Sequence, residues 1–112
     1  MIAVADLHWL AGLLEGEGYF GDHAGGKAGR RYIRISLKMT DKDVVERAAA
    51  LLGTKVHRYS WSADRNPKHS VAWVTQVGQQ DRAAGWMMTL YPLMGARRRA
   101  RIEGLLNAWR QP

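Results

Sequence analysis

Residues 10–18 of this chain read LAGLLEGEG, an apolar segment with regularly spaced glycines that runs directly into two glutamates. A glycine inside a helix costs roughly 1 kcal/mol relative to alanine, so Gly12 requires an explanation. Gly12 and Gly16 lie four residues apart and share one helix face, which lets another helix approach closely. That helix could come from a second copy of the chain or from the same subunit, with Gly16 then serving as a helix cap.

Two copies paired about a two-fold axis would bring Glu17 close to its symmetry mate. Two carboxylates about 4 Å apart repel by roughly 4 kcal/mol at an effective dielectric of 20, so the pair requires protonation or a bound cation. Oxygen ligands without cysteine suit magnesium better than zinc. The competing interpretation is that Glu15 and Glu17 form a solvated helix end.

The composition is that of one folded domain with an anionic partner. The chain has 112 residues, is 46% hydrophobic and contains five tryptophans, which favours a single domain over residues 1–112. Its net charge of +7 favours nucleic acid as the partner, with an acidic membrane surface next. Zero cysteines exclude disulfides and thiolate metal sites. Without a signal-peptide pattern or a membrane-length apolar run, we expect a soluble, intracellular (cytoplasmic) protein.

Apolar residues recur at helical and then at strand spacings along the first half of the chain. Spacings of three and four residues predict a helix over Val4–Glu15, ended by the two glycines that follow. A short extended segment, Tyr19–Phe20, should lead into a glycine-rich loop over Gly21–Gly29. Strict alternation over Arg31–Met39 predicts a strand with one buried face and one polar, basic face.

The second half continues with one helix, two strands and two further helices. Thr40 and Asp43 have capping-box spacing, which predicts a helix over Asp41–Leu52. Two strands joined by a turn-rich segment and two helices separated by Pro92 should follow, over Lys55–Ser62, Ser70–Val77, Asp81–Leu90 and the residues after Gly95. The simplest architecture is an α+β domain with a four-stranded antiparallel sheet.

Arginines crowd the first turns of the final predicted helix, at Arg97, Arg98, Arg99 and Arg101. Cations at a helix N-terminus oppose the helix dipole at a cost of some tenths of a kcal/mol. Four arginines at that end therefore indicate a phosphate or a carboxylate nearby.

The opening stretch, the order of elements and the chain length together resemble the single-motif LAGLIDADG homing endonucleases. The resemblance implies an αββαββα domain whose four-stranded antiparallel sheet is saddle-shaped, with the helices on one face. It also implies a homodimer in which the motif helices form the interface, here through Leu10, Ala11, Gly12, Leu13 and Gly16.

The same resemblance assigns the candidate active-site residues. The last acid of the motif, Glu17, would bind Mg²⁺, and the Gly16 carbonyl would be a second ligand, whereas Glu15 is not a ligand. The run Leu90–Arg98 resembles the family's proline-to-basic segment, so Arg97, with Arg98 next, would lie close to the phosphates. Asp41 holds the polar position after the second strand, where glutamine is frequent in the family. The implied mechanism is metal-assisted phosphodiester hydrolysis.

The sheet would then cover a double-stranded, pseudo-palindromic DNA target. Outward strand residues are candidates for base and phosphate contacts, namely Tyr32, Arg34, Ser36, Lys38, Arg58 and Ser60. Phosphate contacts are expected from basic residues outside these strand positions, namely Lys27, Arg30, Arg31, Arg65, Lys68 and Arg98. The facing of the third strand stays open, because His57, Tyr59 and Trp61 occupy its other side.

The sequence therefore predicts a magnesium-dependent, site-specific double-strand endonuclease of the kind associated with intron or intein mobility. One alternative is a DNA-binding or intron-RNA-binding protein on the same scaffold that has lost cleavage, as in maturases. Another is a basic RNA-binding adaptor, which would prefer A-form RNA over duplex DNA. The acid at position 17 favours the endonuclease.

Overall fold

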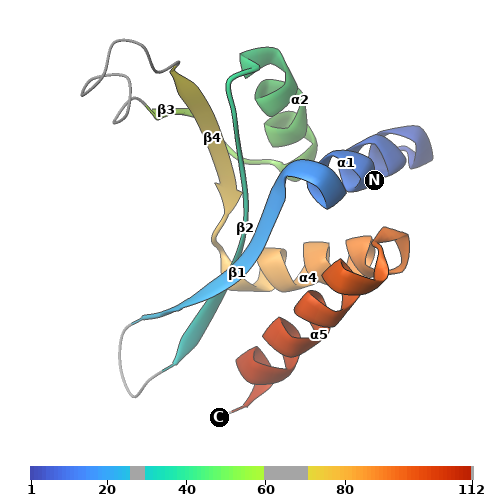
Figure 1. Cartoon of the computed structure of the whole chain (residues 1–112), viewed down its shortest axis with the longest axis vertical. Coiled ribbons are helices and arrows are strands. Elements are labelled where there is room, and N and C mark those ends of the chain that lie inside the picture. Colours follow the sequence, from blue (N-terminus) through green and yellow to red (C-terminus); the bar gives the residue numbers. More distant parts are fainter. Residues whose placement is uncertain (26–29, 60–70, 112) are drawn as a thin grey trace.

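The computed structural model describes residues 1–25, 30–59 and 71–111, which form helices and strands in the expected order (Figure 1). The first half contains α1 (Val4–Glu17), β1 (Gly18–Ala24), β2 (Arg31–Met39) and α2 (Lys42–Leu52). The second half contains β3 (His57–Tyr59), β4 (Ala72–Val77), α4 (Gln80–Leu90), the 3₁₀ turn η1 (Tyr91–Leu93) and α5 (Ala96–Arg110).

The four strands form one antiparallel sheet in the order β1-β2-β4-β3. All the helices cover the same face of this sheet, and the other face is left open and concave (Figure 1). The predicted alternation of β2 is confirmed, because Ile33, Ile35 and Leu37 are buried in the core beneath the helices. The α+β fold with a saddle-shaped sheet and helices on one face is therefore confirmed.

The first helix and the first strand are both longer than the glycines suggested. α1 continues through Gly16 to Glu17, and β1 continues to Ala24 instead of becoming a loop at Gly21. Gly21 pairs with Arg34, and the register continues to Ala24 opposite Arg31. Pairing with a long neighbouring strand outweighs the low strand propensity of glycine.

The other corrections concern element ends. α2 begins at Lys42 with Asp41 as its N-cap and without a side-chain cap hydrogen bond, so Thr40 lies one residue too early for a capping box. The predicted strand Lys55–Ser62 appears as β3 over His57–Tyr59, and its remaining residues from 60, with the turn at 63–68, lie outside the described residues. Pro92 follows α4 as predicted, within η1.

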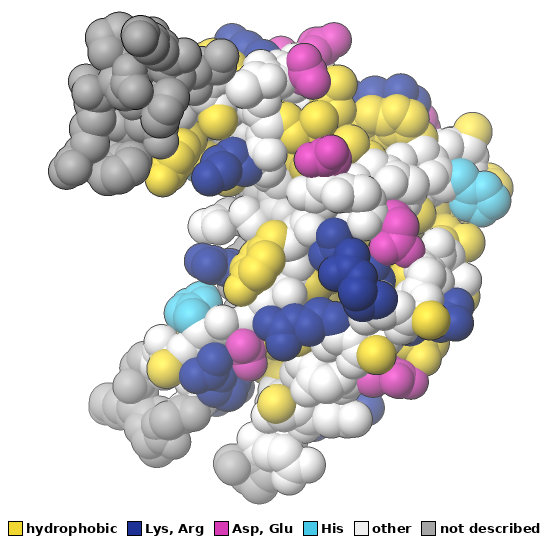
Figure 2. Space-filling view, in the orientation of Figure 1, with side chains coloured by type: hydrophobic (Ala, Val, Ile, Leu, Met, Phe, Trp, Pro, Cys, Tyr) yellow, Lys and Arg dark blue, Asp and Glu magenta, His cyan; other side chains and the backbone are white. Residues whose placement is uncertain are grey.

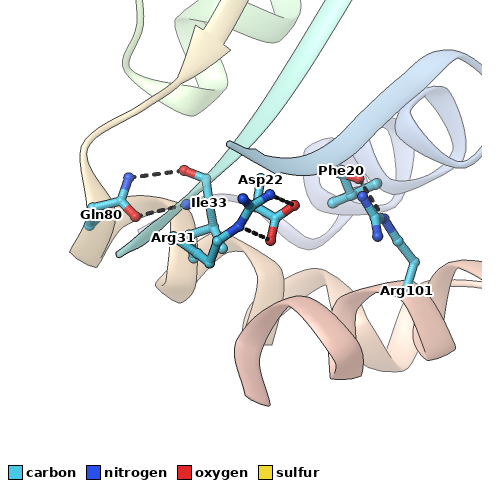
Figure 3. A network of polar contacts seen from close by, with 6 residues as sticks. All are labelled: Phe20, Asp22, Arg31, Ile33, Gln80 and Arg101. Carbon is cyan, nitrogen blue, oxygen red and sulfur yellow. Dashed lines mark hydrogen bonds and ion pairs between the residues drawn. The ribbon is translucent and has the colours of Figure 1, made fainter. Parts of the chain in front are cut away.

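Side chains fasten the end of the sheet where β1 and β2 run beyond β4 (Figure 3). The Gln80 amide oxygen accepts from the Ile33 N–H at 2.8 Å, and its nitrogen donates to the Ile33 carbonyl at 2.9 Å. This side chain continues the pairing of β2 past the last β4 partner, Val77.

A bidentate ion pair joins β1 and β2 at the same end of the sheet (Figure 3). The Arg31 guanidinium donates two bonds of 3.2 and 3.1 Å to the Asp22 carboxylate. These hydrogen bonds hold the pKa of the Asp22 carboxyl below its usual value. Any stability from this pair is therefore present above the unfolded-state pKa of aspartate and is lost as pH falls through the lowered folded-state value.

None of the helices in the described part of the chain combines the length and the apolar character that a membrane crossing requires.

Gly18 allows the sharp passage from α1 into β1. Its N–H bonds to the Leu14 carbonyl, and a Cβ at this position would lie 2.7 Å from that same oxygen. We expect Gly18→Ala to destabilise the fold by about 1–3 kcal/mol, because the helix backbone must shift. Thermal unfolding should show this as a lower Tm. Gly78→Ala is the matched control, since a Cβ there meets no described atom within 4 Å; equal Tm values for the two variants would contradict the account.

Candidate active site and nucleic-acid interface

The open face of the sheet forms a hollow of about 470 Å³ beside the end of α1. Figure 2 shows this concave side of the molecule at the left, with lysine and arginine side chains along it. The hollow is lined by residues of α1 and all four strands: Glu17, Tyr19, Arg34, Ser36, Lys38, Tyr59, Val74 and Gln76. Among the described lining residues Glu17 is the only acid, so a carboxylate borders a surface of basic, polar and aromatic side chains.

Strand register explains why these residues meet. Ser36 pairs with Tyr19 on one side and with Gln76 on the other, so the three side chains form one row across the sheet. Arg34 and Lys38 stand two positions away from Ser36 on the same strand and therefore on the same face. Three of the four predicted outward residues of β2, all except Tyr32, thus line this hollow.

Two tyrosines that the sequence did not single out for this face hold its cations. The Arg34 guanidinium lies 5.6 Å from the centre of the Tyr19 ring, and the Lys38 ammonium lies 4.4 Å from the centre of the Tyr59 ring. Both rings are exposed. Cation–π contacts of this kind restrict long side chains that would otherwise be free to rotate.

Gln76 was also not singled out for this face from the sequence. Gln76 lies between two buried residues of β4, so alternation along this strand could have predicted that its side chain is exposed.

The register of β3 resolves which of its faces turns toward the hollow. His57 pairs with Val74 and Tyr59 pairs with Ala72, so these aromatic residues belong to the concave side. Arg58 alternates to the other side of the sheet, opposite Trp73. The expectation that Arg58 shares a face with Arg34 and Lys38 is therefore wrong.

The remaining predicted DNA contacts are distributed around the sheet. Tyr32 lies on the concave side with its ring centre 5.8 Å from that of His23. Arg30 is exposed, whereas Arg31 is engaged by Asp22. Four candidates lie outside the described residues, namely Lys27, Ser60, Arg65 and Lys68.

Glu17 is the last residue of α1, and its side chain is exposed. The negative end of the helix dipole favours a cation here, and the Gly16 carbonyl is one of the last four, which have no intrahelical donor. Residues 1–25, 30–59 and 71–111 contain no group of three histidine, aspartate or glutamate side chains arranged to hold a metal. The described part of one copy therefore offers one carboxylate and one carbonyl at the end of α1, and both are hard oxygen donors of the kind that suits Mg²⁺.

The other two candidate catalytic residues both lie at the start of a helix. Arg97 is exposed on the first turn of α5, and Asp41 is exposed at the start of α2 and does not line the hollow. Arg98 is the arginine that reaches the end of α1, where its Nε donates to the Glu15 carbonyl oxygen at 3.3 Å. A Glu15 carboxylate oxygen also lies 3.5 Å from this Nε, so Glu15 is a carboxylate of the kind that the arginine cluster predicted.

The glycines of α1 form an uncovered face. No described atom outside the helix backbone lies within 4 Å of the position that a Cβ would take at Gly12 or Gly16. Close packing of these glycines within the described part of the subunit is therefore ruled out. Leu10 and Ala11 are only 0% and 4% exposed, because they face the subunit's own core. Most of their surface is therefore already covered within the subunit, whereas Gly12 and Gly16 lie on the open side and Leu13 is half-buried.

Comparison with solved structures shows that this fold is similar to the fold of several homing endonucleases. The group I intron-encoded homing endonuclease I-CeuI, complexed with DNA, is 13% identical and superposes with a TM-score of 0.71 over 96% of this chain and 55% of its own. The homing endonuclease I-CvuI, in complex with the I-CreI target, is 14% identical, with a TM-score of 0.68 over 92% of this chain and 64% of its own. The archaeal intron-encoded I-Vdi141I, also complexed with DNA, is 16% identical, with a TM-score of 0.59 over 92% and 70%.

This chain therefore spans little more than half of the I-CeuI chain and less than two thirds of the I-CvuI chain. No protein-family model and no curated protein sequence matches it. At these identities the likeness establishes a shared fold.

Proposed function

We propose that this chain is one subunit of a homodimeric, magnesium-dependent homing endonuclease that cuts both strands of a specific DNA site. The observation that carries the proposal is the exposed Glu17 carboxylate, which ends a helix with an uncovered glycine face and borders the basic hollow of the sheet. The solved neighbours are homing endonucleases in complexes with DNA, which supports the same partner here.

Pairing through the Gly12 and Gly16 face would complete the site. A two-fold axis along this face would bring the two α1 ends together, and with them one Glu17 and one Gly16 carbonyl from each copy. It would also set the two hollows side by side, which favours a pseudo-palindromic duplex because each copy meets an equivalent half-site.

Each residue then has a separable role in phosphodiester hydrolysis. Glu17 and the Gly16 carbonyl would hold Mg²⁺, which when bound activates water and stabilises the leaving oxygen. Arg97, exposed at the start of α5, would offset negative charge on the phosphate. Arg34 and Lys38 would contact base edges or phosphates, with Ser36 and Gln76 as neutral hydrogen-bonding partners on the same row.

Removing one cation from the hollow should weaken DNA binding in a salt-dependent way. We expect Lys38→Met to reduce the slope of log affinity against log salt concentration by about one, because one phosphate contact is lost. Fluorescence anisotropy with a labelled duplex between low and physiological salt measures this slope. Lys42→Met is the matched control, since Lys42 lies over Trp73 on the helix-covered side. A slope change of equal size in both variants would refute a specific role for the hollow.

Selection from a randomised DNA duplex library tests the proposed function. The wild-type protein is incubated with the library in Mg²⁺ and in EDTA, and the cut and the bound molecules are sequenced separately. We expect cut molecules to share one pseudo-palindromic sequence and to appear only with Mg²⁺. A sequence that is enriched by binding but never cut would identify a DNA-binding protein instead, and preferential capture of RNA in competition would identify an RNA-binding one.

A further inference from the structure

Glu15, the first acid of the motif, fastens the end of α1 to the start of α5. One of its carboxylate oxygens accepts from the backbone N–H of Gly95, the N-cap of α5. The other lies 3.5 Å from the Nε of Arg98, which also donates to the Glu15 carbonyl oxygen at 3.3 Å. Both carboxylate oxygens are thus directed at α5, eighty residues along the chain.

The location of this contact is electrostatically favourable. A carboxylate at the N-terminus of α5 is stabilised by the positive end of the helix dipole, and a cation at the C-terminus of α1 by the negative end. The Arg98 side chain is only 14% exposed and the Glu15 side chain 37%, so solvent screens the pair less than it screens a typical surface ion pair. Arg98 also lies over the Phe20 ring, at 5.6 Å from its centre.

A second arginine of α5 contacts the chain just after Glu17 in the sequence. Arg101 donates from Nε to the Phe20 carbonyl oxygen at 3.1 Å (Figure 3). Residues 16–19 are therefore bracketed by two contacts with α5, one at Glu15 and one at Phe20. Glu17 and the Gly16 carbonyl lie between these two contacts in the sequence. Neither group takes part in the contacts themselves.

We propose that Glu15 is a positioning residue for cleavage, which acts with Arg98 to hold the last turn of α1 against α5. The pair fixes where the Glu17 carboxylate and the Gly16 carbonyl lie, and so it sets how well they bind Mg²⁺. This inference rests on the proposed endonuclease function. Groups that orient metal ligands typically contribute 10–100-fold to metal affinity or activity.

Two substitutions of Glu15 test this role. We expect Glu15→Ala to lower the cleavage rate about 10–100-fold and to raise the Mg²⁺ concentration for half-maximal cleavage by a similar factor. Glu15→Gln should lose less, because its amide oxygen can still accept from the Gly95 N–H. Metal-free binding to the selected duplex should stay within about twofold of wild type for both variants, since Glu15 does not line the hollow. Glu46→Gln, an exposed glutamate on α2, is the control and should match wild type.

Amide hydrogen exchange at Gly95 provides a measurement that requires no nuclease activity. We expect faster exchange in Glu15→Ala than in wild type, because the acceptor is removed. An unchanged rate of Gly95 amide exchange would overturn the contact between Glu15 and Gly95. Faster exchange together with an unchanged Mg²⁺ dependence of cleavage would overturn the positioning role. If the wild-type protein cuts no duplex, the proposed function is wrong. The positioning role of Glu15 is then wrong as well, whatever the rate of Gly95 amide exchange.

Discussion

Glu17→Gln is expected to lower the rate of DNA cleavage by at least about 10³-fold while leaving affinity for the duplex within about threefold of wild type. A loss of this size corresponds to about 4 kcal/mol of transition-state stabilisation. The substitution keeps the shape of the side chain but removes a charged oxygen donor that Mg²⁺ requires. Binding should persist because the cations of the hollow, Arg34 and Lys38, are unaltered.

The metal-free dimer provides a second test of the same substitution. If two Glu17 carboxylates meet at the two-fold axis, their repulsion of roughly 4 kcal/mol disappears in Glu17→Gln. The metal-free dimer should then dissociate less readily than that of wild type in sedimentation at low salt. Glu46→Gln should change neither property, because its side chain lies on the exposed face of α2. Unchanged cleavage by Glu17→Gln would remove Glu17 from the metal site.

Gly12→Leu is expected to convert the dimer to monomers and to abolish double-strand cleavage. A Cβ at this position meets no described atom within 4 Å, so we expect the monomer to fold normally. Its helix should even gain roughly 0.8–1 kcal/mol from the loss of a helical glycine. In the paired helices the same side chain would occupy the space through which the backbones approach.

Gly104→Leu is the matched control for this prediction. Gly104 is also an exposed helical glycine, in α5, with no described atom within 4 Å of a Cβ. Both variants should stay folded, and only Gly12→Leu should sediment as a monomer at micromolar concentration. A dimer that persists in Gly12→Leu would place the interface elsewhere.

The features that local periodicity specifies were predictable from the sequence. The strand Arg31–Met39 and its buried face follow from alternation alone, because burial of one sheet face imposes a period of two. The spacing of Gly12 and Gly16 likewise identified a helix face that the described subunit leaves uncovered. The order of elements and the α+β class then followed from a few such segments.

Features that depend on distant partners were not predictable in this way. The length of β1 depends on its register with β2, and the facing of Arg58 and Tyr59 depends on the pairing of β3 with β4. The role of Glu15 depends on Gly95, which no local pattern connects to it. The candidate site was thus predicted at Glu17 and along β2, while its supporting contacts required the folded chain.

Incubation of the wild-type protein with its selected duplex, in Mg²⁺ and in EDTA, tests whether this chain is a magnesium-dependent endonuclease. Denaturing and native electrophoresis of the same samples separate strand cleavage from binding. We expect both strands to be cut in Mg²⁺ and the duplex to be bound but intact in EDTA. A discrete complex whose DNA stays uncut in Mg²⁺ would contradict this expectation.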